Sequence, residues 1–188
     1  MATEVNIVNL ALIRLGATTI STMTESTRNA QAAEAIYDLI RQELLREHAW
    51  NFATKRQDLN EADDYDDIST QWDYAYDLPD DCLRALLVND DKSVAFEVTD
   101  DGLLCNDDEV ELKYIKDEDD PTKFSTEFVN LLAMRMAAEL AMPITGSVKK
   151  ATSMWQLYGM FLANSKTHDA QEAFDNADDT NIYRDARR

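Results

Sequence analysis

The spacing of hydrophobic residues changes twice along this chain. Over residues 5–15 and 33–44 they recur every three or four positions, as on one face of a helix. Within residues 58–120 they alternate with polar residues, which is typical of half-buried strands. Helical spacing returns after Pro121. This order predicts an α+β fold: mainly a helical bundle of four helices, with an inserted acidic antiparallel β-sheet segment.

Capping residues mark the ends of these helices, since Ser and Thr suit helix starts and glycine suits helix ends. Starts are expected at Thr3, at Ser26 or Thr27, at Ser125 and at Ser147. Ends are expected at Gly16, about Trp50 and near Pro143.

The chain is expected to divide where the spacing changes. The segments are helices one and two in residues 1–57, an acidic β insertion in 58–120, helices three and four in 121–175, and a C-terminal tail in 176–188. Strands are expected over residues 72–78, 82–88, 94–98, 103–105 and 110–114. Asp101-Gly102 suits a hairpin turn, and short connections favour antiparallel pairing.

The net charge of −19 comes from the middle of the chain. Residues 58–120 hold 23 acidic and 4 basic residues, whereas the segments on either side are balanced. Such a surface repels phosphates, so DNA binding by counterion release is not expected. The acidic segment suits a basic partner, divalent cations, DNA that passes without sticking, or simply solvent.

Motifs for catalysis or cofactor binding are missing from the sequence. His48 and His168 have no second histidine at zinc-site spacing, and the four glycines form no phosphate-binding loop. Cys82 and Cys105 read as reduced thiols. The sequence contains no run of about 18 apolar residues, so no transmembrane helix is expected. We therefore expect no enzyme, no catalytic residue, no cofactor and no metal, although abundant carboxylates leave glycoside hydrolysis open.

The stretch REHAWNFATKR, residues 46–56, closes the second helix beside the acidic segment. Trp50 and Phe52 are interpreted as a structural junction that packs bundle and sheet together. The bases of this stretch, Arg46, Lys55 and Arg56, are expected to pair with the acidic residues that follow.

Several short motifs follow one another along nearly the whole chain. Leu15-Gly16 is followed by Ser21-Thr22-Met23, an Ala-containing helix and Trp50-Asn51-Phe52. The stretches YAYDLPDDCLRAL and FSTEFVNLLAMRMAAELAMPIT come next, and YRDAR stands near the end. In this order the motifs resemble the head-to-tail adaptor proteins of short-tailed phages, the tail tubular protein A family, with YRDAR the faintest part of the likeness. The family often ends in Trp-x-x-Ala-Arg where this chain has Tyr183, and Ala17 stands where a proline is usual.

The resemblance implies a structural virion protein at the head–tail junction, assembled in the host cytoplasm. Such proteins form a homo-oligomeric ring, commonly of twelve copies, which binds the portal protein and receives the tail nozzle protein. Genomic double-stranded DNA passes through the ring without sequence-specific binding, and no membrane is involved. The expected partner-binding residues are in the tail: Tyr183, Arg184, Arg187 and Arg188.

Two other functions remain open from the residues. A virion-associated peptidoglycan hydrolase would use two of the many carboxylates. An acidic DNA-mimic binding module would occupy a basic protein through the acidic segment, with an affinity that salt weakens.

Overall fold

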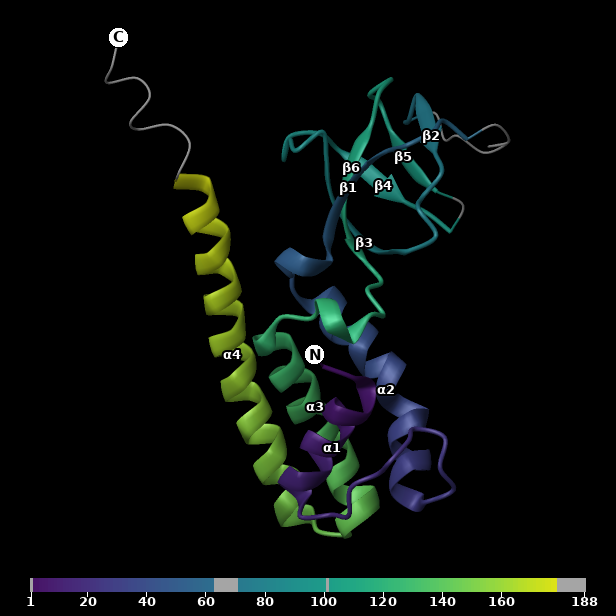
Figure 1. Cartoon of the computed structure of the whole chain (residues 1–188). Coiled ribbons are helices and arrows are strands. Elements are labelled where there is room, and N and C mark those ends of the chain that lie inside the picture. Colours follow the sequence, from purple (N-terminus) through teal and green to yellow (C-terminus); the bar gives the residue numbers. More distant parts are fainter. Residues whose placement is uncertain (1, 63–70, 101, 179–188) are drawn as a thin grey trace. The chain divides into compact units, whose positions relative to one another are not determined.

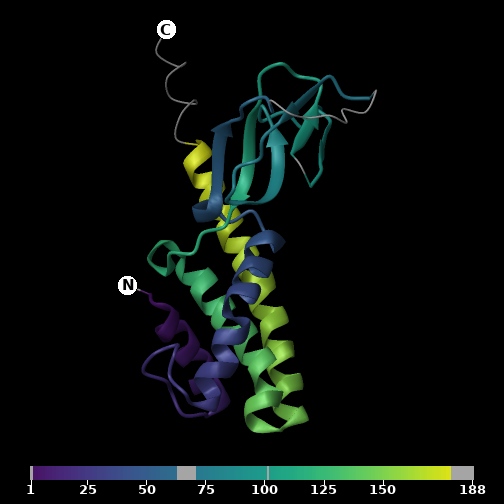
Figure 2. The same ribbon diagram turned by 90° about the vertical axis from the view of Figure 1, so that its right-hand side faces the viewer.

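The computed structural model describes residues 2–62, 71–100 and 102–178, with side chains described up to residue 164 (Figures 1 and 2). The chain forms two compact units. A helical unit joins residues 1–44 to residues 119–188, and a sheet unit is made by the intervening residues 45–118. Four helices and two small antiparallel sheets give the α+β class expected from the sequence.

The helical unit contains α1 (Glu4–Leu15), α2 (Arg28–Glu47), α3 (Thr126–Thr145) and α4 (Val148–Asp178). The short 3-10 helix η2 (Pro121–Lys123) precedes α3. α3 packs against both α1 and α4, and Figure 2 shows α3 and α4 running side by side. Ten residues of α3 are buried, so this helix is the centre of the core. Fully buried partners on α1 are Ile7, Ala11 and Leu12.

The expected helix caps are confirmed. Thr3 accepts a hydrogen bond from the Asn6 amide at 3.2 Å, and Ser125 accepts one from the Phe128 amide at 3.2 Å. Thr27 accepts from the Ala30 amide at 3.3 Å, just before α2. Gly16 closes α1 with φ of 65°, a left-handed conformation that glycine adopts without a steric penalty.

Two helix ends differ from expectation. α3 does not stop near Pro143 but continues to Thr145, and the amide of Gly146 then donates to the Met142 carbonyl at 3.0 Å. A proline so close to the end costs one intrahelical hydrogen bond, which the last turn tolerates. α4 continues to Asp178, so the first residues of the expected polar tail are helical.

The sheet unit holds two three-stranded antiparallel sheets (Figure 1). The first has the order β1 (Thr54–Asp58), β6 (Glu111–Lys116), β3 (Cys82–Val88), and the second has the order β2 (Tyr74–Tyr76), β5 (Leu103–Cys105), β4 (Phe96–Val98). The 3-10 helix η1 (Asn51–Ala53) leads into β1. The expected strands over 82–88 and 103–105 are confirmed, as is the antiparallel pairing.

β1 was not expected, because its sequence TKRQD has no apolar alternation and its side chains are mostly exposed. Pairing with β6 makes it a strand. The strand expected over residues 72–78 is shorter than predicted. β2 begins only at Tyr74, and Trp72 packs instead with Ala75 and Leu104.

One core cluster links the two sheets of this unit. It contains Tyr76, Val88, Leu103, Cys105, Val110, Leu112 and Tyr114. Asp101, the first residue of the expected hairpin turn, lies outside the described residues. At Gly102 a side chain would clash with the backbone carbonyl of Tyr76, so glycine allows β5 to start this close to β2.

Candidate interaction surfaces

α4 carries a wide apolar surface that its own unit covers only in part. The covered part packs on the helical unit through Tyr158, which is 6% exposed, with Met154 and Leu162 half-buried beside it. Next to it lie Leu157, Met160 and Phe161, at the i, i+3, i+4 spacing of one helical stripe. These three side chains are 38%, 65% and 39% exposed. We call them the outer stripe. Because the helical unit leaves much of their surface uncovered, they are available to another partner.

Arg135 of α3 fixes the surroundings of this helix. Its guanidinium lies 4.7 Å from the centre of the Trp155 ring and 5.4 Å from that of Tyr158. The same group pairs with Glu139 at 2.9 Å and with Glu43 of α2 at 3.1 Å. Trp155, at 40% exposure, is therefore held against α3 by a cation–π contact.

Other exposed apolar side chains of the helical unit lie on different helices. Ile13 of α1 and Leu39 of α2 are 62% and 61% exposed, and Met142 and Val148 flank the turn between α3 and α4. Single exposed apolar residues are common on protein surfaces. The outer stripe is distinguished by having three neighbours on one helix.

α3 meets the length and hydropathy of a membrane span, which the sequence did not lead us to expect. More than half of its apolar window is buried inside the helical unit, and core helices commonly have this composition.

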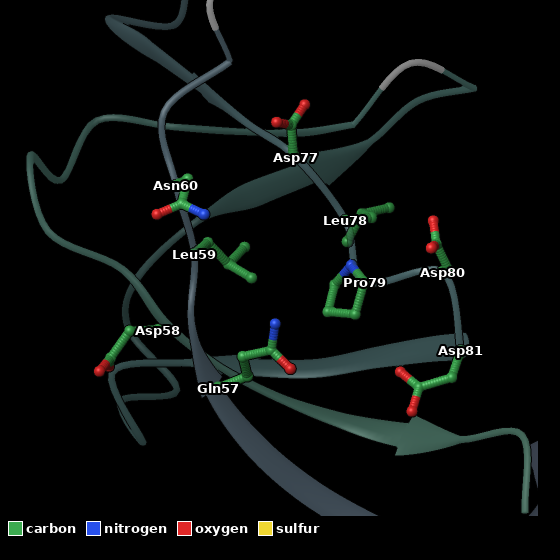
Figure 3. Close-up of a pocket in the computed structure, with 9 residues that line it drawn as sticks. All are labelled: Gln57, Asp58, Leu59, Asn60, Asp77, Leu78, Pro79, Asp80 and Asp81. Carbon is green, nitrogen blue, oxygen red and sulfur yellow. The ribbon is translucent and has the colours of Figure 1, made fainter.

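The sheet unit has two neighbouring hollows separated by the segment 58–60. The proline groove, about 400 Å³ in volume, is lined by Gln57, Asp58, Leu59, Asn60, Asp77, Leu78, Pro79, Asp80 and Asp81. In Figure 3 the side chains of Gln57 and Leu59 point toward its middle, facing the Pro79 ring, and the Asp58 carboxylate points away. The tyrosine groove, about 640 Å³, is lined by Asp58, Leu59, Asn60, Glu61, Tyr76, Asn89, Asp108, Glu109, Val110 and Glu111.

Backbone hydrogen bonds hold the dividing segment in place. The Leu59 amide donates to the Val110 carbonyl at 2.8 Å, and the Asp77 amide donates to the Asn60 carbonyl at 3.0 Å. Asn89, with φ of 53°, closes the far wall. Its side-chain amide donates to the Glu109 carbonyl and to Asp107, both at 3.0 Å. Both grooves are therefore formed by fixed backbone.

The basic residues near the grooves are already paired. Lys55 lies 3.8 Å from Asp81, and Arg56 lies 2.7 Å from Asp90, which confirms the expected pairing for these two bases. Hydrogen bonding to Arg56 holds the pKa of Asp90 below its ordinary value. Lys113 also faces Asp90, at 3.6 Å.

Six carboxylates of the groove walls form no ion pair with any described residue: Asp58, Glu61, Asp77, Asp80, Asp108 and Glu109. Below them, burial raises the pKa of Tyr76 to about 12, with added effects from Cys105, Glu61 and Asp108. The grooves are therefore sites of concentrated, uncompensated negative charge.

The expected junction residues lie at the start of the sheet unit. Trp50 is fully buried, and its ring is 4.8 Å from that of His48 and 6.3 Å from that of Phe52. Phe52 is half-buried. The junction role of both stays a prediction. The expected partner-binding residues Tyr183, Arg184, Arg187 and Arg188 lie outside the described residues, and so does the side chain of His168.

No three His, Cys, Asp or Glu side chains converge to hold a metal ion among the described residues. Cys105 is buried and Cys82 half-buried, and burial raises the pKa of both thiols.

Sequence reasoning missed both the outer stripe and the grooves. Helical spacing marks Phe161 as an apolar position but does not show that it stays exposed, and no local pattern shows that residues 58–60 and 77–81 lie together. The chain matches no protein-family model and no curated protein.

Proposed function

We propose that this protein is a structural virion protein, a head-to-tail adaptor. In this proposal copies of the chain form a ring beneath the portal, join it to the tail nozzle and extend the DNA channel. The outer stripe carries the proposal, because three adjacent apolar side chains on one helix favour burial against another subunit. The family resemblance supplies the identity of that assembly. The chain itself carries out no reaction.

A closed ring uses two different surfaces of each subunit, since every copy contacts its neighbours head to tail. The outer stripe of α4 would provide one surface. Exposed apolar residues on other helices, such as Ile13 of α1 and Leu39 of α2, are candidates for the other. In this arrangement the four helices act as a bundle that forms the wall of the ring.

The acidic β insertion has a separate role in the proposal. With 23 acidic and 4 basic residues over positions 58–120, it repels DNA phosphates. Facing the channel or the tail, it would let DNA slide without adhering. The assembled protein would thus belong to the virion at the head–tail junction.

The test compares two double variants of full-length protein. Met160→Glu with Phe161→Glu places charges in the outer stripe. Thr152→Glu with Gln156→Glu adds the same charge at exposed positions of α4 outside the stripe. Native mass spectrometry and electron microscopy follow each protein alone and mixed with its cognate portal ring. We expect the wild type and the control to assemble on the portal, and the stripe variant to remain monomeric.

Two results would contradict the adaptor. One is a wild-type chain that stays monomeric and never binds portal. The other is a stripe variant that assembles as the wild type does, which would remove the outer stripe from the interface.

The unpaired groove carboxylates favour a second candidate, an acidic DNA-mimic module that binds a basic protein. Capture of a basic host protein that about 0.5 M salt releases, without any portal binding, would support that function instead. Lysis zones in a zymogram on purified cell wall would identify the third possibility, a peptidoglycan hydrolase.

A further inference from the structure

α2 exposes a short apolar row beside acidic residues. Ala35 and Leu39 are exposed and lie at the i, i+4 spacing of one helix face. Glu34 and Asp38 are exposed as well and form a second row along the same side of the helix. Asp38 lies 3.5 Å from Arg41, whereas Glu34 forms no ion pair with any described residue. We call the four exposed residues the α2 face, which offers apolar contact with negative charge at its edge.

The outer stripe of α4 has the opposite charge beside it. Lys149, Ser153 and Leu157 follow one another at i, i+4 and i+8, so Lys149 lies on the side of the outer stripe, two turns before it. Lys149 is exposed and forms no ion pair with any described residue. Residues 148–164 contain two lysines and no acid. The outer stripe and the α2 face are therefore complementary in charge, and both expose apolar side chains.

These two surfaces lie on opposite sides of the helical unit. In Figures 1 and 2, α1 and α3 lie between α2 and α4. A copy therefore cannot cover its own outer stripe with its own α2 face, and the contact has to come from a second copy. Subunits with complementary surfaces on opposite sides assemble head to tail, as a ring requires.

α2 and α4 also run in the same direction. Both begin at the same end of the unit, because Arg28 of α2 donates to the carbonyl of Pro143, shortly before α4. Leu39 follows the start of α2 by 11 residues, and Leu157 follows the start of α4 by 9. At about 1.5 Å per residue, both side chains lie about 14–17 Å along their helices. A closed ring keeps neighbouring copies at one height, so these leucines meet when the ring axis follows the helices.

We propose that the outer stripe of one copy packs on the α2 face of the next copy, with Leu157 against Leu39 and Lys149 beside Glu34. The two charged residues are offset by about 8 Å along the helices, which their long side chains bridge. The inference rests on the proposed ring and names the contact between its subunits. Ile13 of α1 is then not part of this contact.

A charge swap tests the pair in full-length chains that assemble on the cognate portal ring. Lys149→Glu and Glu34→Lys each place like charges at the contact, so each should raise the protein concentration for half-maximal assembly about threefold or more. Both substitutions in one chain restore opposite charges and should return this concentration to within about twofold of the wild type. Circular dichroism checks that each variant is folded.

The matched control for the swap is Lys149→Glu with Asp119→Lys. Asp119 is an exposed acid of the helical unit outside both surfaces, so this variant has the net charge of the swap without restoring the pair. We expect it to assemble as poorly as Lys149→Glu alone.

Disulfide trapping tests the apolar part of the contact. Leu39→Cys with Leu157→Cys should give ladders of linked chains on the portal, because packed side chains bring Cα atoms within the roughly 7 Å that a disulfide spans. Ile13→Cys with Leu157→Cys is the matched pair and should give none. Mass spectrometry identifies the linked residues and so separates these links from any through Cys82, which is half-buried.

The outcomes separate this contact from the adaptor function. Wild-type chains that assemble on the portal, with no 39–157 link or no rescue by the charge swap, would overturn the contact and leave the adaptor standing. A link between positions 157 and 13 would overturn it too, by assigning the outer stripe to α1. Wild-type chains that never assemble would remove the adaptor function, and this contact with it.

Discussion

The helical unit and the sheet unit differ in the surface that they expose: the first exposes apolar side chains on one helix, and the second exposes mainly acidic side chains. The helical unit holds 15 acidic and 11 basic residues, buries most of α3, and leaves an apolar stripe on α4. The sheet unit, of 74 residues, holds 22 acidic and 7 basic residues, and its groove rims carry unpaired carboxylates. Covering the apolar stripe with another molecule lowers the free energy. The acidic surface of the sheet unit resists association except with cations.

This difference shows how one chain can carry a surface that favours association and another that opposes it. Apolar contact is not directional and is hardly weakened by salt, so it suits a permanent subunit interface. Exposed charge acts over about 8 Å at physiological ionic strength and responds to salt, so it suits a passing polyanion or a reversible cationic ligand. Separation into two units keeps these properties apart along the sequence.

The largest expected effects come from the buried aromatic residues of each unit. Trp50→Ala in the sheet unit and Phe128→Ala in the helical unit each remove a fully buried ring. Each should lower the free energy of unfolding by about 3–5 kcal/mol through loss of packing and cavity formation. Native-state hydrogen exchange reports this for each unit separately. Phe52→Ala, at a half-buried position, is the milder control.

If the two units have separate cores, protection should fall first in the unit that carries the substitution. Equal loss across the whole chain from either variant would show a single cooperative core. Unchanged melting and unchanged assembly of Trp50→Ala would refute the junction role of that residue.

The next effect separates two buried tyrosines. Tyr114 of the sheet unit donates to Asp81 at 2.8 Å, so Tyr114→Phe should cost about 1–2 kcal/mol of stability. Tyr37 of the helical unit is 3% exposed, and its hydroxyl has no hydrogen-bond partner among the described residues. Tyr37→Phe should therefore be neutral or slightly stabilising. Denaturant titrations of both variants measure the contrast, and an equal loss in both would contradict it.

Alkaline pH should destabilise the sheet unit more than the helical unit. Burial raises the pKa of Tyr76 to about 12, and burial and the hydrogen bond to Asp81 raise the pKa of Tyr114. In the helical unit burial raises the pKa of Tyr37. Above pH 10, the ordinary value, unfolded tyrosines lose protons that the folded ones keep. Stability is therefore complete below pH 10 and falls as the pH rises. Tyrosinate absorbance follows the loss of tyrosine protons, and circular dichroism follows the loss of folded structure. A loss of structure at alkaline pH that is confined to the helical unit would contradict the prediction.

Salt should give the smallest effect. Screening the unpaired groove carboxylates should stabilise the sheet unit by less than about 1 kcal/mol between 0.05 and 0.5 M salt. The nearly balanced helical unit should change less. Separate thermal probes, with fluorescence of Trp72 for the sheet unit and of Trp155 for the helical unit, make the comparison. If salt stabilises the helical unit more than the sheet unit, the unpaired charge does not lie mainly on the sheet unit, and the contrast between the two surfaces is wrong.

Local sequence was a good guide where one interaction sets the structure. Thr3, Gly16 and Ser125 act at helix ends within one turn, so their roles follow from neighbouring residues. The pairing of Lys55 and Arg56 with acids also followed from composition, because acids greatly outnumber bases around them. The exact partners did not follow, since Asp81 and Asp90 reach these bases only through the sheet.

Sequence reasoning failed where distant residues decide. TKRQD becomes β1 because β6 offers it hydrogen bonds, although its own residues give no strand pattern. Trp72 lies outside β2, because this strand begins at Tyr74 and not where the alternation of apolar residues begins. On α4, periodicity marked apolar positions but not how many of them the unit would cover.

The sequence by itself determined the α+β class, the order of the four helices and of every strand except β1, and the concentration of negative charge in the middle of the chain. These depend on residue spacing, on capping and on charge counts, all of which are local. Only the tertiary structure decided that one apolar stripe of α4 is left uncovered and that residues 57–60 and 77–81 enclose a groove. Burial and concavity depend on contacts between residues far apart in the chain, which no local pattern records.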